Sequence, residues 1–175
     1  IITETLFSMD GDIVDIEGVR FLAKKFNSFL YIDEAHSMGV LGKNGFGIAS
    51  NTYNEKEVII GTFGKSFGSY GGFVSSSKKI YDKIINTCSG LIYSSALPPG
   101  NYAAISEAIK IIPKLKSSRK KLLENSRFLI KELNKVNINT GSSNSQIIPI
   151  ILGDERKCFE LQSFLRKNGF FVKVI

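Results

Sequence analysis

The chain has 175 residues, 43% of them apolar, which is enough to bury the core of one domain or slightly more. It carries 23 Lys and Arg against 16 Asp and Glu, a net charge of +7, but the lysines are scattered and favour no nucleic-acid partner. No apolar run approaches the ~20 residues of a membrane span, and the first residues lack a signal-peptide pattern. We therefore expect a cytoplasmic globular protein without a membrane partner.

Two local features of the composition are expected to be structural only. Cys88 and Cys158 lie far apart, without CxxC or His-rich spacing, so the sequence predicts neither a disulfide framework nor a metal site. The basic run KLKSSRKK at 114–121 interrupts a helical pattern, which favours the solvated face of a helix.

The first part of the chain alternates between strand and helix patterns. The sequence predicts strands at 2–8, 28–32, 57–63, 71–76 and 91–95, and helices at 15–26, at 78–89 and from Pro98 to about Ile112. The run SFLYI at 28–32 is continuously apolar, as is typical of a strand covered on both faces in a parallel sheet. This alternation predicts an α/β fold with right-handed crossovers.

The pattern changes at Lys114. A long charged helix is predicted from there to about Val136, followed by a Ser/Asn/Gly linker at 139–145, a strand at 146–152, a helix at 157–169 and the apolar end FFVKVI. This predicts one unit at 1–113 and the start of a smaller α+β unit at 114–175. Because the chain begins without Met and ends on an unpartnered strand pattern, we expect an internal segment of a longer protein.

The segment FLYIDEAHSMGVLG, at 29–42, contains the letters DEAH, which in many helicases hold Mg²⁺-ATP. A nucleotide-binding protein also needs a phosphate loop of the form G-x-x-x-x-G-K-[ST], placed before this box. The only Gly-Lys-Ser is Gly64-Lys65-Ser66; it follows Asp33, and Ile59 stands where the first glycine belongs. The order and the spacing both argue against a DEAH-type nucleotide-binding protein.

A different cofactor fits the same residues. Working groups of α/β sheets follow the carboxyl ends of strands, as Asp33 does. Pyridoxal 5'-phosphate (PLP) needs an amine that carries it as a Schiff base, an anion for its ring nitrogen, a donor for its phenolate oxygen and hydroxyls for its phosphate. Lys65, Asp33, His36 and Thr62 offer these groups. Each of them alone has an ordinary structural explanation, but their conjunction predicts a PLP site.

Four segments carry a resemblance to a known family. TETLFSMDGD, YIDEAHSMGVLGKNGFG, GTFGKSFGSYGG and IYSSALPP occur in the same order and spacing as in the α-oxoamine synthases, PLP enzymes of fold type I. The resemblance implies the three-layer, mostly parallel sheet of the PLP-dependent transferase large domain, followed by part of a small α+β C-terminal domain. It also implies an acyltransferase that joins an amino acid to an acyl thioester, from CoA or a carrier protein, with loss of CO₂.

Carried over residue by residue, the resemblance implies an active site. Lys65 is the lysine that carries PLP, Asp33 the partner of the ring nitrogen, and His36 a contact of the phenolate oxygen; these three are the expected catalytic residues. Ser8 is expected near the same oxygen, and Thr62 at the phosphate.

The remaining implied contacts involve the ring faces and a second subunit. Ala35 is expected on one face of the ring. Ser94 matches a residue that reaches the phosphate of the neighbouring subunit's cofactor, which implies a homodimer with shared active sites. The family's ring-stacking histidine and its carboxylate-binding arginine have no counterpart within residues 1–175.

The motif wording also resembles particular branches of the family. DEAHSMGVLG, IYSSALPP and SQIIPIILGD, at 145–154, are most like the 8-amino-7-oxononanoate synthases, which condense L-alanine with a pimeloyl thioester in biotin biosynthesis. Glycine C-acetyltransferases and serine palmitoyltransferases share most of these words and stay open as alternatives. A non-catalytic scaffold is the alternative of another class, and cofactor binding separates it from the enzymes.

Overall fold

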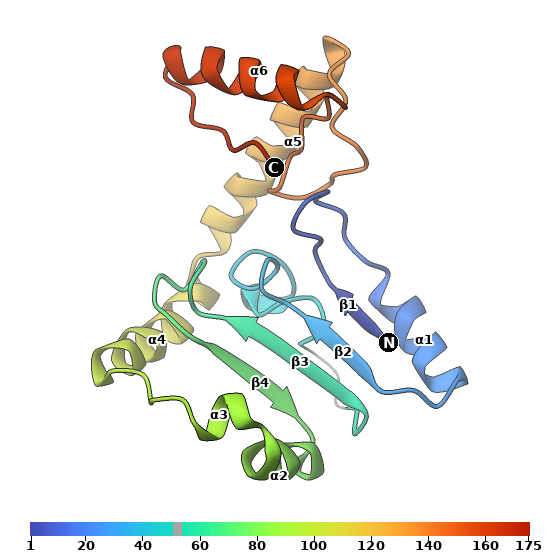
Figure 1. The fold of residues 1–175 in the computed structure, drawn as a ribbon, viewed down its shortest axis with the longest axis vertical. Helices are drawn as coiled ribbons and strands as arrows, with labels where there is room; N and C mark the ends of the chain where they lie inside the picture. Colours follow the sequence, from blue (N-terminus) through green and yellow to red (C-terminus); the bar gives the residue numbers. More distant parts are fainter. Residues whose placement is uncertain (51–53) are drawn as a thin grey trace.

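The computed structural model describes residues 1–50 and 54–175, within which one four-stranded sheet forms the centre of the molecule (Figure 1). The strands are β1 (Ile2–Glu4), β2 (Leu30–Asp33), β3 (Glu57–Thr62) and β4 (Gly72–Ser76), side by side in that order. The β1–β2 and β2–β3 pairs are parallel, and β4 runs antiparallel to β3. The expected mostly parallel sheet is confirmed.

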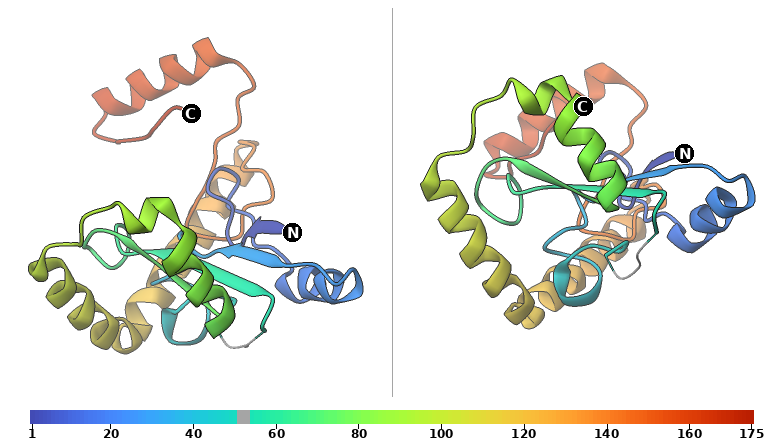
Figure 2. Two further views of the ribbon diagram at one scale, coloured as in Figure 1. Left: turned by 60° about the horizontal axis from the view of Figure 1, so that its bottom comes forward. Right: turned by 90° about the horizontal axis from the view of Figure 1, so that it is seen from below.

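Helices cover both faces of this sheet. They are α1 (Ile16–Lys25), α2 (Lys78–Thr87), α3 (Ser89–Ile92), α4 (Pro99–Ile111), α5 (Lys116–Lys135) and α6 (Glu155–Lys167), with short 3₁₀ turns η1 (Lys43–Gly45) and η2 (Ile112–Lys114). Figure 2 shows α2 and α3 over one face, and the loop after β2 with the start of α5 over the other. This arrangement confirms the three-layer α/β fold.

The core lies on the face opposite α2 and α3. Asp15 caps α1 by accepting a hydrogen bond from the Gly18 N–H, at 3.1 Å. The helix buries Ile16 and Ala23 against the alternate β2 residues Leu30 and Ile32. A second cluster forms around Met38, Phe67 and Ile112, and it packs the loop after β2 against the end of α4.

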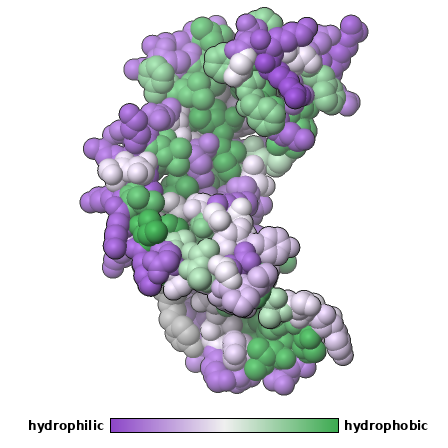
Figure 3. All heavy atoms as spheres, turned by 90° about the vertical axis from the view of Figure 1, so that its left-hand side faces the viewer, coloured by the Kyte–Doolittle hydropathy of each residue, from purple (hydrophilic) through white to green (hydrophobic). Residues whose placement is uncertain are grey.

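Residues 114–175, hereafter the C-terminal unit, lie largely apart from the sheet, at the top of Figure 1. Helix α6 is capped by Asp154, whose carboxylate accepts from the Lys157 N–H at 2.8 Å. Apolar side chains gather on the surface of this unit in Figure 3. Two of its phenylalanines, Phe164 and Phe171, are 63% and 85% exposed. The boundary between Pro113 and Lys114 stays a prediction.

Three expected strands are wrong. Residues 91–95 fall partly in α3 and pair with no strand that the structure describes, because a short apolar run fits a helical turn as well as a strand. Residues 146–152 and 170–175 form neither helix nor strand, and they pair with no strand among the described residues. Pro149 has no N–H to donate to a ladder, and extended backbone becomes a strand only when a neighbour pairs with it.

The other elements are confirmed within a few residues. β1 is shorter than the expected 2–8, since its pairing with β2 ends at Glu4. None of the helices in the described part of the chain combines the length and apolar character that crossing a membrane requires.

Candidate cofactor-binding site

The predicted site residues gather at the carboxyl-terminal edge of the sheet. Asp33 ends β2 and Thr62 ends β3, and the parallel pairing of these strands places both ends at one edge. Lys65 follows three residues after Thr62. A hydrogen bond of 2.6 Å from the Ser66 hydroxyl to the Met38 carbonyl ties the Lys65 turn to the loop after β2. The edge therefore joins the two motifs that the sequence separates.

Thr62 organises the turn that carries Lys65. Its hydroxyl accepts from the Gly64 N–H at 3.1 Å and donates to the Gly71 carbonyl at 3.2 Å. The turn closes through Gly68, whose N–H donates to the Lys65 carbonyl at 3.0 Å and whose φ of +63° suits glycine.

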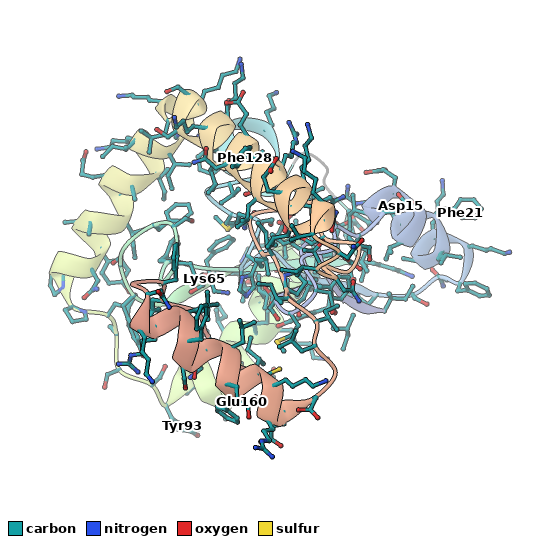
Figure 4. The ribbon with its side chains drawn as sticks, turned by 90° about the horizontal axis from the view of Figure 1, so that it is seen from above. Asp15, Phe21, Lys65, Tyr93, Phe128 and Glu160 are labelled. Carbon is teal, nitrogen blue, oxygen red and sulfur yellow. The ribbon has the colours of Figure 1, made fainter. Side chains whose placement is uncertain are left out.

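The side chain of Lys65 is exposed, and its ammonium has no hydrogen-bond or salt-bridge partner among the described residues. In the view from above in Figure 4, Lys65 lies within the outline of the molecule, whereas Phe21 and Tyr93 lie at its periphery. Because it is exposed and has no partner among the described residues, the amine is accessible to a ligand.

Asp33 uses only part of its carboxylate within the protein. Oδ1 accepts from the Ala35 N–H at 2.7 Å, which closes the turn after β2, and Ala35 is half-buried there. No donor in the described part of the chain contacts Oδ2. One oxygen thus shapes the loop, and the other is available to a cationic group.

His36 is half-buried and feels three neighbouring charges. Burial lowers the pKa of its imidazole, and the Lys65 ammonium lowers it further, while the Glu4 and Asp33 carboxylates act in the opposite direction. With a pKa below 6.5, the ring is neutral at pH 7, with one nitrogen as a donor and the other as an acceptor. The structure therefore brings Lys65, Asp33 and His36 together, as expected.

Glu34 anchors the loop that carries Ala35 and His36. Its buried carboxylate accepts from the Thr5 hydroxyl at 2.7 Å, from the Ser37 hydroxyl and from the Ala49 N–H. Burial raises its pKa, and the bonds to Ala49 and Thr5 oppose that rise. The carboxylate thereby joins the end of β1 to both ends of the loop.

Ser8 and Ser94 lie in different surroundings. The Ser8 N–H donates to the Glu4 carboxylate at 3.2 Å, and the residue also lines a groove of about 900 Å³ shared with residues 147–154 of the C-terminal unit. Ser94 is exposed, and its hydroxyl donates to the Leu91 carbonyl at 3.1 Å. Within one chain, the described contacts of Ser94 do not include Lys65. The expected role of Ser94 across a dimer stays a prediction.

Sequence reasoning missed three residues around this site. Glu4 acts on His36 and holds Ser8, Ser66 ties the two loops, and Gln146 of the C-terminal unit donates to the His36 carbonyl at 2.9 Å. Glu4 ends β1 in the structure, a position that signals the site edge, but the strand predicted at 2–8 placed Glu4 in its middle. Gln146 has no such signal, because its contact depends on how the two units pack.

The residues present match the groups that PLP requires. An amine without a protein partner, a carboxylate with a free oxygen, a neutral imidazole and a threonine hydroxyl lie at one sheet edge. The glycines of the Lys65 turn also leave room for a ligand. A Cβ built on Gly68 would meet nothing within 4 Å, and one on Gly64 would lie 3.4 Å from the Thr62 hydroxyl and 4.0 Å from the Ser69 carbonyl oxygen.

Known proteins resemble this chain along its length. The aminotransferase class I and II family matches residues 1–174. The 8-amino-7-oxononanoate synthase of Gluconacetobacter diazotrophicus is 38% identical over 169 residues, which cover 97% of this chain and 42% of that protein. A relative from Paramagnetospirillum magneticum is 43% identical, over 97% of this chain and 43% of its own length. The chain thus spans less than half the length of these curated relatives.

Solved structures agree with the sequence relatives. Serine palmitoyltransferase from S. paucimobilis, with bound PLP-myriocin aldimine, superposes with a TM-score of 0.89 at 28% identity, covering 99% of this chain and 46% of that one. The 8-amino-7-oxononanoate synthase of Francisella tularensis gives a TM-score of 0.85 at 31% identity, covering 99% and 52%. The chain therefore belongs to the aminotransferase class I and II family, and its place there is among the α-oxoamine synthases.

Proposed function

We propose that the complete protein is a PLP-dependent acyltransferase that condenses an amino acid with an acyl thioester and releases CO₂. The observation that carries this proposal is the meeting of Lys65, Asp33 and His36 at the ends of β2 and β3. Similarity to 8-amino-7-oxononanoate synthases over 97% of the chain supports L-alanine and pimeloyl-CoA, or a pimeloyl-carrier protein, as the substrates.

Each residue has a stated task in this proposal. The Lys65 amine would attach PLP covalently, the free oxygen of Asp33 would pair with the ring nitrogen, and His36 would donate to the phenolate oxygen. Thr62 would serve the phosphate, Ser8 the phenolate side, and Ala35 one face of the ring. When bound, PLP supplies an electron sink for the negative charge that develops at the substrate Cα.

The protein's own groups then handle the protons. Once the substrate amine has replaced it on PLP, the freed Lys65 amine, which lies near His36, would be the base for the proton on the substrate Cα. Asp33 keeps the ring nitrogen protonated through its negative charge, while its other oxygen still binds the Ala35 N–H. Because His36 is neutral near pH 7, it offers a hydrogen bond without adding a positive charge beside the Lys65 amine.

The proposal includes a homodimer and a small C-terminal domain. Ser94 lies in an exposed segment beside Tyr93, which is 87% exposed, as a residue that serves a partner subunit must be. Residues 1–113 form part of the large domain, and residues 114–175 begin the small one.

A serine palmitoyltransferase-type reaction is the second candidate, because that structural neighbour has the higher TM-score, 0.89 against 0.85. The sequence identities favour 8-amino-7-oxononanoate synthase, at 31% against 28% for the same two structures. Turnover of the complete protein with alanine, glycine and serine, each with a short-chain, a pimeloyl and a palmitoyl thioester, separates the candidates.

Borohydride reduction tests the site itself. Reduction of the PLP-loaded protein, followed by peptide mass analysis, is expected to place the pyridoxyl group on Lys65. A Lys65→Arg variant, which keeps the charge but cannot form the bond, serves as the control and should remain unlabelled. A label on Lys43 or Lys78 would overturn the assignment.

A further inference from the structure

Gln146 connects the C-terminal unit to the candidate site. Its side-chain Nε2 donates a hydrogen bond of 2.9 Å to the main-chain carbonyl of His36, a residue 110 positions away in the sequence. The contact reaches His36 at its backbone, directly after the turn that Asp33 and Ala35 close. A group that holds this carbonyl also limits where the His36 ring stands.

The segment that carries Gln146 is itself firmly placed. Ser143 and Ser145 are buried on its N-terminal side, and the Ser145 hydroxyl accepts from the Ile147 N–H at 3.2 Å. The next residue along lies close to the turn after β1, since a Cβ built on Gly11 would be only 2.1 Å from the Ile147 carbonyl oxygen. The amide of Gln146 is therefore presented to His36 from a backbone with little freedom.

The environment of the Gln146 side-chain oxygen indicates that its Nε2 donor has a role in the structure. Gln146 Oε1 is buried and has no hydrogen-bond partner among the described residues. A buried carbonyl oxygen without a donor is unfavourable, and an apolar side chain of similar size would avoid the cost. Within the part of the chain that the structure describes, the hydrogen bond that offsets this cost is the one from Nε2 to the His36 carbonyl.

We propose that Gln146 is a positioning residue, which sets the His36 ring relative to Lys65 and Asp33 by holding the His36 carbonyl. Its importance for catalysis rests on the proposed function, but its effect on His36 does not require the cofactor. The charged groups that face the ring are Lys65 after β3, Glu4 of β1 and Asp33 of β2.

Three variants of the complete, cofactor-free protein test the contact. Gln146→Leu removes both the Nε2 donor and the Oε1 oxygen that lacks a hydrogen-bond donor. Gln146→Glu keeps the shape of the side chain but replaces the donor with a negative charge. Ser142→Ala is the matched control, because its hydroxyl bonds the Asp12 carboxylate at 3.1 and 3.2 Å and makes no contact with His36. It loosens the same segment at a different point.

The readout is the NMR titration of the His36 ring, assigned by the signal that His36→Asn removes. In Gln146→Leu, the midpoint is expected to rise toward 6.5, because a less tightly held ring gains water and moves from the Lys65 charge. Gln146→Glu is expected to raise it further, and Ser142→Ala to leave it unchanged. Equal midpoints in the wild type and both Gln146 variants would overturn the proposal, and so would an equal rise in Ser142→Ala.

Kinetics of the PLP-loaded protein provide the second readout. Loss of one hydrogen bond that orients a group is expected to lower kcat about twofold to tenfold in Gln146→Leu, with the KM for the amino acid unchanged. If the wild-type protein binds no PLP, the proposed function fails, while the titration still decides on Gln146. If Gln146→Leu does not fold, Gln146→Met, which also lacks the donor and adds no charge, carries both measurements.

Discussion

The carboxylate of Glu34 occupies the space that a side chain at Gly47 would need. A Cβ built on Gly47 would lie 2.6 Å from both Cδ and Oε2 of Glu34, and the φ of Gly47 is +90°. Glycine is therefore required twice, by the backbone conformation and by the buried anion beside it. This pair closes the loop in which Ala35 and His36 stand.

We expect Gly47→Ala to destabilise the complete protein by more than the roughly 1–3 kcal/mol that a strained φ alone costs, because the methyl group also displaces the Glu34 carboxylate. Gly153→Ala is the matched control: its φ is +68°, but a Cβ there would meet nothing within 4 Å. The free energy of unfolding, from urea titration, measures both. Equal losses in the two variants would contradict the steric part of the argument.

Thr62 offers a test of the Lys65 turn. Thr62→Val keeps the shape but loses the bonds to the Gly64 N–H and the Gly71 carbonyl, so we expect a loss of about 1–3 kcal/mol in stability and weaker PLP binding. Thr62→Ser retains the hydroxyl and should keep PLP affinity within a few-fold of wild type. Absorbance titration with PLP measures the affinity; indistinguishable Val and Ser variants would argue against a role for the hydroxyl.

Asp33→Asn separates charge from shape. The asparagine carbonyl can still accept from the Ala35 N–H, so the fold and the unfolding midpoint should change little. Without the carboxylate charge, the ring nitrogen of PLP is no longer kept protonated, and we expect turnover to fall about a hundredfold or more, equivalent to ~2.7 kcal/mol. Near-normal turnover by a correctly folded variant would remove Asp33 from the proposed ring contact.

The lowered pKa of His36 predicts how the free energy of unfolding depends on pH. Its pKa is lowered on folding, so between the folded value and about 6.5 the unfolded chain binds more protons than the folded protein. The stability contributed by the neutral ring is therefore present above 6.5 and is lost as the pH falls through the folded pKa.

Denaturant midpoints from pH 7.5 to 5.5 measure this effect. The wild type should lose stability over the lower part of the range, and His36→Gln, which cannot titrate, should lose less. Parallel curves for the two proteins would show that the ring does not change its pKa on folding.

The amino-acid sequence by itself determined the local structure and the chemistry of the site. Apolar runs and spacings of 3.6 residues depend only on near neighbours, and so β2, β3, α1 and α5 are where the pattern placed them. The chemistry of Lys65, Asp33, His36 and Thr62 was also readable, because strand ends in a parallel sheet converge at one edge.

Tertiary structure alone decided what depends on a distant partner. Residues 91–95 and 146–152 have apolar runs that suit a strand, yet neither pairs with a strand within residues 1–50 and 54–175, because pairing is a property of two segments and not of one. The same reason hides Gln146, whose amide meets the His36 carbonyl only after the C-terminal unit packs against the loop that follows β2. Burial decided the rest: the lowered pKa of His36 and the raised pKa of Glu34 arise from solvent excluded by the whole fold.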